Sequence, residues 1–319
     1  MKKDSLVTIT FPVFERTTYF IEAIESAINQ TVEVPIIVVD NASSHYEFQE
    51  ICSKYGDRIK YFRNNENIGM FGNWNKCFEL VDTKYAIIVG DDDILSPTYI
   101  EEFYKAYEIN PDIDVYYTGV YFYALKDGKF SNFETNWINR IGRSTGYDIK
   151  SDSWKSKLYF PTISCIIRVD VQKKYKFETR LHTANDKLFI YTLPDQCVFY
   201  GNSHKLYRYR LHETNDSNGM KNILEFAHSL ILITLRNYSN LSFWNLLKCY
   251  GRMCVYLRKE PLLKQQITTK ESFYSSAYKE LTNGKNVPIY VISWMISYIM
   301  EARKYVKDAI FLHSDKNLN

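Results

Sequence analysis

Three consecutive acidic residues follow a short apolar run in the stretch Tyr85-Ala86-Ile87-Ile88-Val89-Gly90-Asp91-Asp92-Asp93. The apolar run is rich in β-branched residues and bounded by polar ones, which predicts a buried strand over Tyr85–Val89. Adjacent carboxylates repel one another unless a cation or hydrogen-bond donors neutralise them. The acids therefore have two interpretations. They bind a Mg²⁺ or Mn²⁺ ion that also holds substrate phosphates, or they form an acidic entry to the helix that Ser96-Pro97 begins.

Strand and helix signals alternate on the N-terminal side of this stretch. The predicted strands are Leu6–Phe11, Ile36–Val39 and Ile59–Phe62, and the predicted helices are Tyr19–Asn29 (with Ile21, Ile24 and Ile28 on one face), His45–Tyr55 and Asn73–Val81. This alternation predicts an α/β fold with a mainly parallel sheet and helices on both faces. Ligands of such sheets bind beyond the carboxyl ends of the strands, where Pro12, Asp40 and Asp91 all fall.

The pattern on the C-terminal side is less regular. It predicts helices over Pro97–Tyr107 and Asp186–Leu193, strands over Val115–Tyr123, Ser164–Val169 and Leu206–Arg210, and a mobile polar loop over Lys126–Ser153. The polar segment Glu213–Lys221 is the best candidate for a linker. We therefore expect a catalytic domain over residues 1–216, with halves 1–97 and 98–216, and a helical region over residues 217–319.

The amino-acid composition limits the classes of function that this chain can have. The chain has 319 residues and a net charge of +3, from 40 basic and 37 acidic side chains, which is too balanced for a nucleic-acid-binding surface. The six cysteines form no C-x-x-C pair and no zinc spacing, so they are expected to be reduced thiols of a cytoplasmic protein. The apolar stretch near the N-terminus is too short for a signal peptide.

Several segments resemble the family 2 glycosyltransferases, which have the GT-A fold, over roughly Leu6 to Asp216. They are Thr10-Phe11-Pro12-Val13-Phe14-Glu15-Arg16, Glu22–Thr31, Val38-Val39-Asp40-Asn41-Ala42-Ser43, Asn67–Asn75 and Gly90-Asp91-Asp92-Asp93-Ile94-Leu95-Ser96-Pro97. Each segment is weak alone, but their order and spacing together are specific. The last one occupies the position of the family's DxD motif.

The resemblance implies roles for the residues at these strand ends. Asp93 would bind the metal directly, Asp91 would face the ribose and metal-bound water, and Asp92 would support them. Asp40 would accept a hydrogen bond from the base, which suits the N3–H of uracil. Donor binding would also involve Pro12, Phe14, Glu15 and Asn67, although Glu15 replaces a common asparagine and has a solvated charge as its alternative role.

The resemblance also extends to the acceptor half. Asp186, in Thr183–Phe189, would be the general base that takes the proton of the acceptor hydroxyl in an inverting transfer. Its alternative role is a favourable charge at a helix N-terminus. His212, in Tyr207–Ser217, would complete the metal coordination. Arg208 and Arg210 alternate on one strand, where they would meet a diphosphate or remain solvated.

The segment Val287–Met300 is apolar and aromatic but too short to span a bilayer. Arg303, Lys304 and Lys307 follow it, so the segment either lies on an anionic membrane or is a helix buried against the catalytic domain or a second copy of the chain.

The sequence thus predicts a Mn²⁺- or Mg²⁺-dependent inverting glycosyltransferase. It would move a sugar from a nucleoside diphosphate donor, most simply UDP-linked, to a glycan acceptor in bacterial polysaccharide synthesis. A lipid-linked acceptor would suit a peripheral membrane location, and the oligomeric state is open. The alternatives are a sugar nucleotidyltransferase, disfavoured by the lack of a glycine-rich basic opening, and a non-enzymatic nucleotide- or glycan-binding scaffold.

Overall fold

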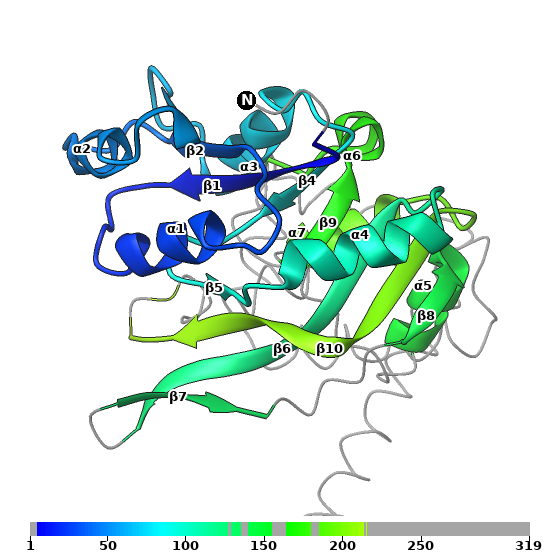
Figure 1. Cartoon of the computed structure of the whole chain (residues 1–319). Helices are drawn as coiled ribbons and strands as arrows, with labels where there is room; N and C mark the ends of the chain where they lie inside the picture. The colour runs from blue at the N-terminus through cyan, green and yellow to red at the C-terminus, as the bar shows by residue number, and fades with distance from the viewer. Residues whose placement is uncertain are drawn as a thin grey trace, which may run out of the picture. The chain divides into compact units, whose positions relative to one another are not determined.

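One sheet with helices on both faces forms the described part of the chain (Figure 1). The computed structural model describes residues 5–126, 129–134, 140–154, 164–179, 185–213 and 215. The chain divides into two compact units, Met1–Asn218 and Gly219–Asn319. The second unit lies outside the described residues, and with it the apolar segment 287–300. The assignment of residues 1–216 and 217–319 to separate functional domains stays a prediction.

The N-terminal half of the sheet has the expected parallel strands, in the order β3-β2-β1-β4. The strands are β1 (Val7–Val13), β2 (Ile36–Asp40), β3 (Ile59–Arg63) and β4 (Tyr85–Ile88). Their connections contain α1 (Phe20–Ile28), α2 (Glu47–Ser53), the short 3₁₀ helix η1 (Gly56–Arg58) and α3 (Met70–Glu79). All the strands and helices predicted in this half are confirmed, with α3 beginning at Met70 rather than at Asn73.

The other half makes the sheet mixed as a whole. It consists of β5 (Ile94–Leu95), α4 (Tyr99–Ile109), β6 (Val115–Lys126), β7 (Lys129–Phe133), β8 (Gly142–Thr145), α5 (Gly146–Trp154), β9 (Cys165–Arg168), α6 (Val169–Tyr175), α7 (Asn185–Thr192) and β10 (Val198–Leu211). Strand β9 lies antiparallel between β4 and β6, and β10 runs parallel to β6. Because β4 and β6 are both antiparallel to β9, β6 and β10 run in the same direction as the N-terminal strands, so the expectation of a mainly parallel sheet is confirmed, with β9 and the short outer strands as antiparallel additions.

The prediction of a mobile loop over Lys126–Ser153 is wrong. Within that range β7 forms an antiparallel hairpin with β6, β8 pairs with β10, and α5 follows directly. Figure 1 shows β6, β7 and β10 side by side as a long ribbon at one end of the sheet. Strands β7 and β8 lie off the main strand order, so their polar side chains can face water.

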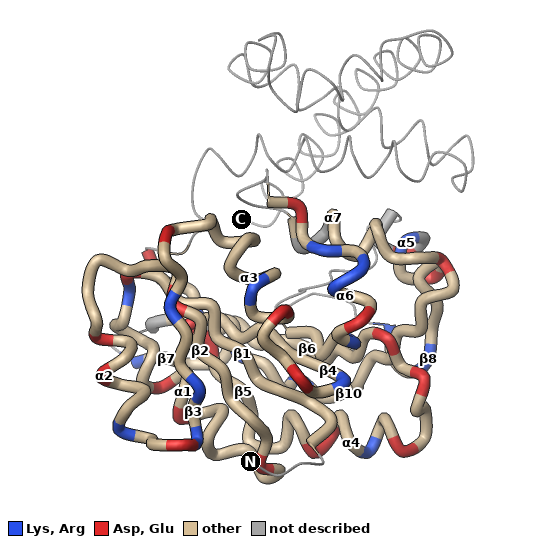
Figure 2. Tube along the Cα trace, turned by 90° about the horizontal axis from the view of Figure 1, so that it is seen from above, with Lys and Arg blue, Asp and Glu red and all other residues tan. Residues whose placement is uncertain are grey.

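Successive side chains along each strand point to opposite faces of the sheet, so each face has its own apolar core. Tyr85 and Ile87 of β4 pack in the core that α1, α2 and α4 cover, whereas Ala86 and Ile88 pack in the core beneath α3, α6 and α7. Figure 2 shows α3 and α6 on the opposite side of the strands from α4, with charges of both signs interspersed. The buried face of α1 consists of Phe20, Ala23, Ile24 and Ala27. Ile21, expected on that face, is exposed instead.

Four cysteines of the described part, Cys52, Cys77, Cys165 and Cys197, are buried free thiols. This agrees with the expectation of reduced core cysteines. Within the same residues, we find no helix with the length and apolar character that crossing a membrane requires.

Candidate functional site

The carboxyl ends of the parallel strands bring the predicted residues to one edge of the sheet. Strand register aligns Val13 of β1 with Asp40 of β2 and Arg63 of β3. The loops that leave these strands then contact one another and the acidic turn after β4. The expected convergence of the strand ends is therefore present.

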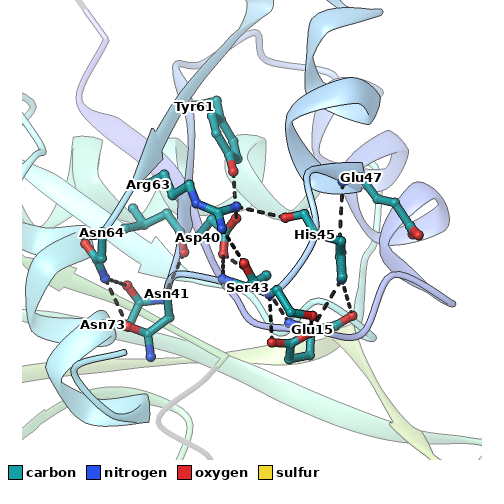
Figure 3. Close-up of polar contacts among 12 residues, drawn as sticks. Glu15, Asp40, Asn41, Ser43, His45, Glu47, Tyr61, Arg63, Asn64 and Asn73 are labelled. Carbon is teal, nitrogen blue, oxygen red and sulfur yellow. Dashed lines mark hydrogen bonds and ion pairs between the residues drawn. The ribbon is translucent and has the colours of Figure 1, made fainter. Parts of the chain in front are cut away.

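Asp40 is the centre of a polar cluster in the turn after β2 (Figure 3). Its Oδ1 accepts hydrogen bonds from the Ser43 amide at 2.9 Å and the Ser43 hydroxyl at 2.7 Å. Its Oδ2 accepts from the Tyr61 hydroxyl at 2.6 Å and from Arg63 Nη1 at 2.9 Å. Arg63 also donates to the carbonyl oxygens of Ser43 and His45, so it ties the whole turn to β3.

These four hydrogen bonds saturate the acceptor capacity of a fully buried carboxylate. The sequence assigned Asp40 to the base of a nucleotide, and an N–H of a base would have to take the place of one of the four donors. In this structure Asp40 instead fixes the shape of the turn. The charge of Arg63 offsets the cost of burying the carboxylate.

Glu15 fastens the loop after β1 to the loop after β2. Its carboxylate accepts hydrogen bonds from the amide and hydroxyl of Ser44 at 2.8 and 2.7 Å, and its own amide donates to the Ser43 hydroxyl at 2.9 Å. The Ser44 hydrogen bonds lower the pKa of Glu15. Its φ of 59° lies in the left-handed region, where a residue other than glycine is strained. Glu15 is thus a clamp between two loops, which differs from both roles considered from the sequence.

An amide network supports the next segment along this edge. Asn41 donates to Asn67 Oδ1 at 2.8 Å and accepts from Asn64 Nδ2 and from the Ile68 amide, both at 3.0 Å. Asn64 also donates to Asn73 at 2.9 Å (Figure 3). Asn67 itself is exposed, and the network holds its backbone at the edge of the site where the sequence placed it.

Asp91 and Asp92 lie in the turn after β4 and share Arg16, and His212, which follows β10, reaches Asp92. His212 Nε2 lies 2.9 Å from Asp92 Oδ2, and Arg16 Nη2 lies 2.7 Å from both Asp91 Oδ1 and Asp92 Oδ2. The contact between His212 and the acids joins β10 to β4 across more than a hundred residues, as the sequence implied. Arg16 was not among the predicted site residues, although its position just past the end of β1 would have indicated it.

Asp93 faces the interior rather than the site. It is 1% exposed, its Oδ2 accepts a hydrogen bond from the Tyr207 hydroxyl at 2.6 Å, and its Oδ1 accepts from the Arg210 amide at 2.9 Å. Burial, followed by the neighbouring charge of Asp92, raises the pKa of Asp93 well above the usual range. The prediction of Asp93 as the direct metal ligand does not fit this geometry. Asp92, which was assigned a supporting role, occupies the position beside His212.

Gly90 allows the acidic turn to fold this tightly. A Cβ atom on Gly90 would lie 2.8 Å from both Asp92 Oδ1 and Asp93 Oδ2, which is closer than Cβ contacts occur. Any larger residue would therefore push the two carboxylates out of position.

Arg210 is buried among aromatic rings and does not reach a solvent-exposed site. Its Nε donates to the Asp92 carbonyl oxygen at 2.7 Å, and its Nη2 donates to Glu22. The guanidinium carbon lies 4.5 to 4.8 Å from the ring centroids of Tyr19, Phe130 and Tyr123. Arg210 therefore has neither of the roles considered from the sequence, a diphosphate contact or a solvated charge. It supports the acidic turn from the interior side.

Of the remaining predicted residues, the structure places the side chains of Pro12 and Phe14 but not that of Asp186. Pro12 is half-buried near the end of β1, and Phe14 is 42% exposed on the loop that follows. Both lie at the edge where the donor pocket was expected. Asp186 lies in the first turn of α7, but its side chain is outside the described atoms, so its catalytic role stays a prediction.

The acidic turn fits a divalent cation that is bound partly through its substrate. Within the described residues, no three His, Cys, Asp or Glu side chains are arranged to enclose a metal ion. Carboxylates and an imidazole are nevertheless suitable ligands for Mn²⁺, and Mg²⁺ is commonly held by one or two carboxylates plus substrate phosphates. Asp92 and His212 can supply two such ligands, with Asp91 next to them in the chain, and substrate oxygens would have to supply the rest.

Known proteins share both the sequence pattern and the fold. The family described as glycosyl transferase family 2 matches residues 8–174, just over half of the chain. An uncharacterized glycosyltransferase of Methanocaldococcus jannaschii, MJ1057, is 29% identical over 57% of this chain and 62% of its own length. Glycosyltransferase GlyG of Streptococcus pneumoniae is 24% identical over 88% of this chain and 99% of its own. The minor teichoic acid biosynthesis protein GgaB of Bacillus subtilis is 24% identical over 70% of this chain, which spans 25% of GgaB.

Two solved structures have a similar fold at low identity. Residues 1–349 of S. aureus TarS in complex with UDP-GlcNAc give a TM-score of 0.62 at 14% identity, with 90% of this chain and 79% of that chain covered. The mannosyltransferase PcManGT from Pyrobaculum calidifontis, in complex with GDP-Man and Mn²⁺, gives 0.55 at 10% identity, with 93% and 86% covered. At such identities the likeness establishes the fold.

Proposed function

Because the chain belongs to glycosyl transferase family 2 and is a glycosyltransferase, we propose that it moves a sugar from UDP to a glycan hydroxyl in a metal-dependent, inverting reaction. The observation that carries the proposal is the contact of His212 with Asp92, next to Asp91, at the carboxyl edge of the parallel strands. UDP as the carrier is supported by TarS, whose structure holds UDP-GlcNAc, and metal use by PcManGT, whose structure holds Mn²⁺.

In this proposal Asp92 and His212 hold the cation, and Asp91 lies next to it toward the donor. A cation held there would supply the positive charge that offsets the charge of the leaving diphosphate. Phe14, Pro12 and Asn67 line the donor pocket, while Asp40 and Glu15 keep its loops in place through the hydrogen bonds described above. This assignment transfers the direct metal contact from Asp93 to Asp92.

Asp186 is the proposed general base. It would take the proton of the acceptor hydroxyl as that oxygen attacks the anomeric carbon, a function that contributes about 10²–10⁴-fold to rates. The acceptor is proposed to be a bacterial surface polymer, because GgaB is named for teichoic acid biosynthesis. A lipid-linked acceptor and peripheral membrane contact through residues 287–307 belong to the same proposal.

Asp186→Ala tests the mechanism separately from donor binding. We expect the variant to bind UDP and Mn²⁺ like the wild type and to lose at least about 100-fold in transfer rate, measured as UDP release with an acceptor present. Asp170→Ala is the matched control, since Asp170 also begins a helix and is exposed. Unchanged turnover in Asp186→Ala would reject the base. Release of pyrophosphate from a nucleoside triphosphate would identify a nucleotidyltransferase instead.

A further inference from the structure

Arg16 lies where a cation between the two carboxylates would be expected. A single nitrogen, Nη2, bridges one oxygen of Asp91 and one of Asp92, each at 2.7 Å. The same Asp92 oxygen is the one that His212 approaches. Two adjacent carboxylates repel unless a positive charge lies between them, and the guanidinium supplies that charge here.

A divalent cation and this guanidinium cannot share the position. Both would contact Asp92 Oδ2, and like charges at contact distance repel strongly in a partly buried site. The side chain of Arg16 is 25% exposed, so it has a path toward solvent, whereas the Asp91 and Asp92 side chains are 14% and 11% exposed. Because Arg16 is the most exposed of the three side chains, we take it as the group that moves.

Glu15 anchors this loop through its side chain, and the Arg16 amide donates to the Phe14 carbonyl oxygen at 2.7 Å, so neither contact involves the guanidinium. Glu15 is fixed by Ser43 and Ser44, and its left-handed backbone directs the chain back toward the acidic turn. A rotation of the Arg16 side chain thus leaves the clamp intact. A guanidinium released at this edge faces the place proposed for the diphosphate, and arginine is well suited to bind phosphate oxygens in a bidentate manner.

We propose that Arg16 is a built-in counter-cation that a divalent metal must displace, and that the displaced guanidinium then binds the diphosphate of the donor. The first half concerns the metal alone, and the second half rests on the proposed function. Metal and donor are then coupled, because each favours the conformation in which Arg16 has left the carboxylates.

The metal half is tested by titrating Mn²⁺ into the full-length protein without nucleotide and measuring free Mn²⁺ by electron paramagnetic resonance. We expect Arg16→Gln to bind Mn²⁺ about tenfold more tightly than the wild type, a typical size for such coupling. Arg58→Gln is the matched control, because it removes one positive charge from an ion pair with Glu33 outside the acidic turn, and its Mn²⁺ affinity should not change. Melting in EDTA checks that both variants fold, and Arg16→Lys, which keeps the charge, should bind Mn²⁺ less tightly than Arg16→Gln.

The outcomes separate this inference from the proposed function. Equal or weaker Mn²⁺ binding by folded Arg16→Gln overturns the counter-cation role and leaves the metal site in place. Absence of Mn²⁺ binding in every variant, both without nucleotide and with UDP present, overturns the metal site and the inference together. The proposed contact between Arg16 and the diphosphate has its own test. The affinity for UDP at saturating Mn²⁺ should fall about tenfold in Arg16→Gln, and an unchanged affinity would overturn this contact.

Discussion

Asp92 and Asp93 are neighbours in the sequence but face opposite environments. Asp92 shares one oxygen with Arg16 and His212 at the edge of the site, whereas both oxygens of Asp93 accept hydrogen bonds from buried donors. The difference arises because the Tyr207 hydroxyl and the Arg210 amide of β10 hold Asp93 in the interior, whereas Arg16 and His212 hold Asp92 at the edge. Motif spacing alone therefore could not show this difference between Asp92 and Asp93.

The contrast predicts different effects on stability. Asp93→Ala leaves the Tyr207 hydroxyl and the Arg210 amide without acceptors in the interior, at about 1–3 kcal/mol each. Relief of repulsion with Asp92 offsets part of that cost, so we expect the free energy of unfolding to fall by about 2 kcal/mol. Asp92 is also buried, at 8% exposure, but Asp92→Ala leaves Arg16 paired with Asp91, so it should cost less than Asp93→Ala. Urea unfolding in EDTA measures both, and the reverse ranking would contradict the buried position of Asp93.

The residues that sequence reasoning placed correctly are those that follow strand ends. Asp40, Asp91 and Pro12 all lie at the predicted edge because parallel strands must bring their carboxyl ends together. The partners of these residues were not predictable in the same way. Arg63 and Tyr61 bond to Asp40 only because β3 lies in a particular register with β2, and register is a property of the assembled sheet.

At the scale of elements, Arg210 joins β10 to several other parts of the fold. Its side chain contacts α1 through Glu22, the acidic turn through the Asp92 carbonyl, and the β6–β7 hairpin through Tyr123 and Phe130. The sequence indicated only an alternating basic strand. Its burial depends on the β6–β7 hairpin, and β7 lies in the range that was predicted to be a loop.

Arg210→Lys should therefore destabilise the fold, although the substitution keeps the positive charge. A lysine keeps the charge but lacks the planar fork that donates in two directions and stacks between rings. We expect the free energy of unfolding to fall by about 3 kcal/mol, as when a buried, hydrogen-bonded charge loses its partners. Arg208→Lys, two residues earlier on the same strand and half-buried, should change it by less than about 0.5 kcal/mol. Equal effects of the two substitutions in urea unfolding would show that Arg210 does not hold these elements together.

The failed loop prediction has a physical cause at the same scale. The segment over β7 and β8 is polar and alternates weakly, so local propensity favours a loop. Pairing with β6 and β10 supplies the hydrogen bonds that order these residues, and those partner strands are distant in the sequence for β8. The parallel half has strong local signals in each strand and was predicted almost completely.

For the whole molecule, the site is assembled from loops that follow β1, β2, β4 and β10. A ligand that contacts these loops together binds the folded chain and not the unfolded one, so it must raise stability. At 100 times its Kd such a ligand adds about 2.7 kcal/mol. For a unit of roughly 200 residues that corresponds to a rise in Tm of several degrees.

We expect UDP with Mn²⁺ to raise Tm by about 5 °C or more, and either alone to raise it much less, because Arg16 and the metal compete for the same carboxylates until a diphosphate is present. UMP with Mn²⁺ is the control, since it keeps the base and ribose but lacks the second phosphate. EDTA should abolish the effect of UDP. If UMP and UDP raise Tm equally, or if EDTA leaves the shift unchanged, the donor is not held through a metal at the acidic turn.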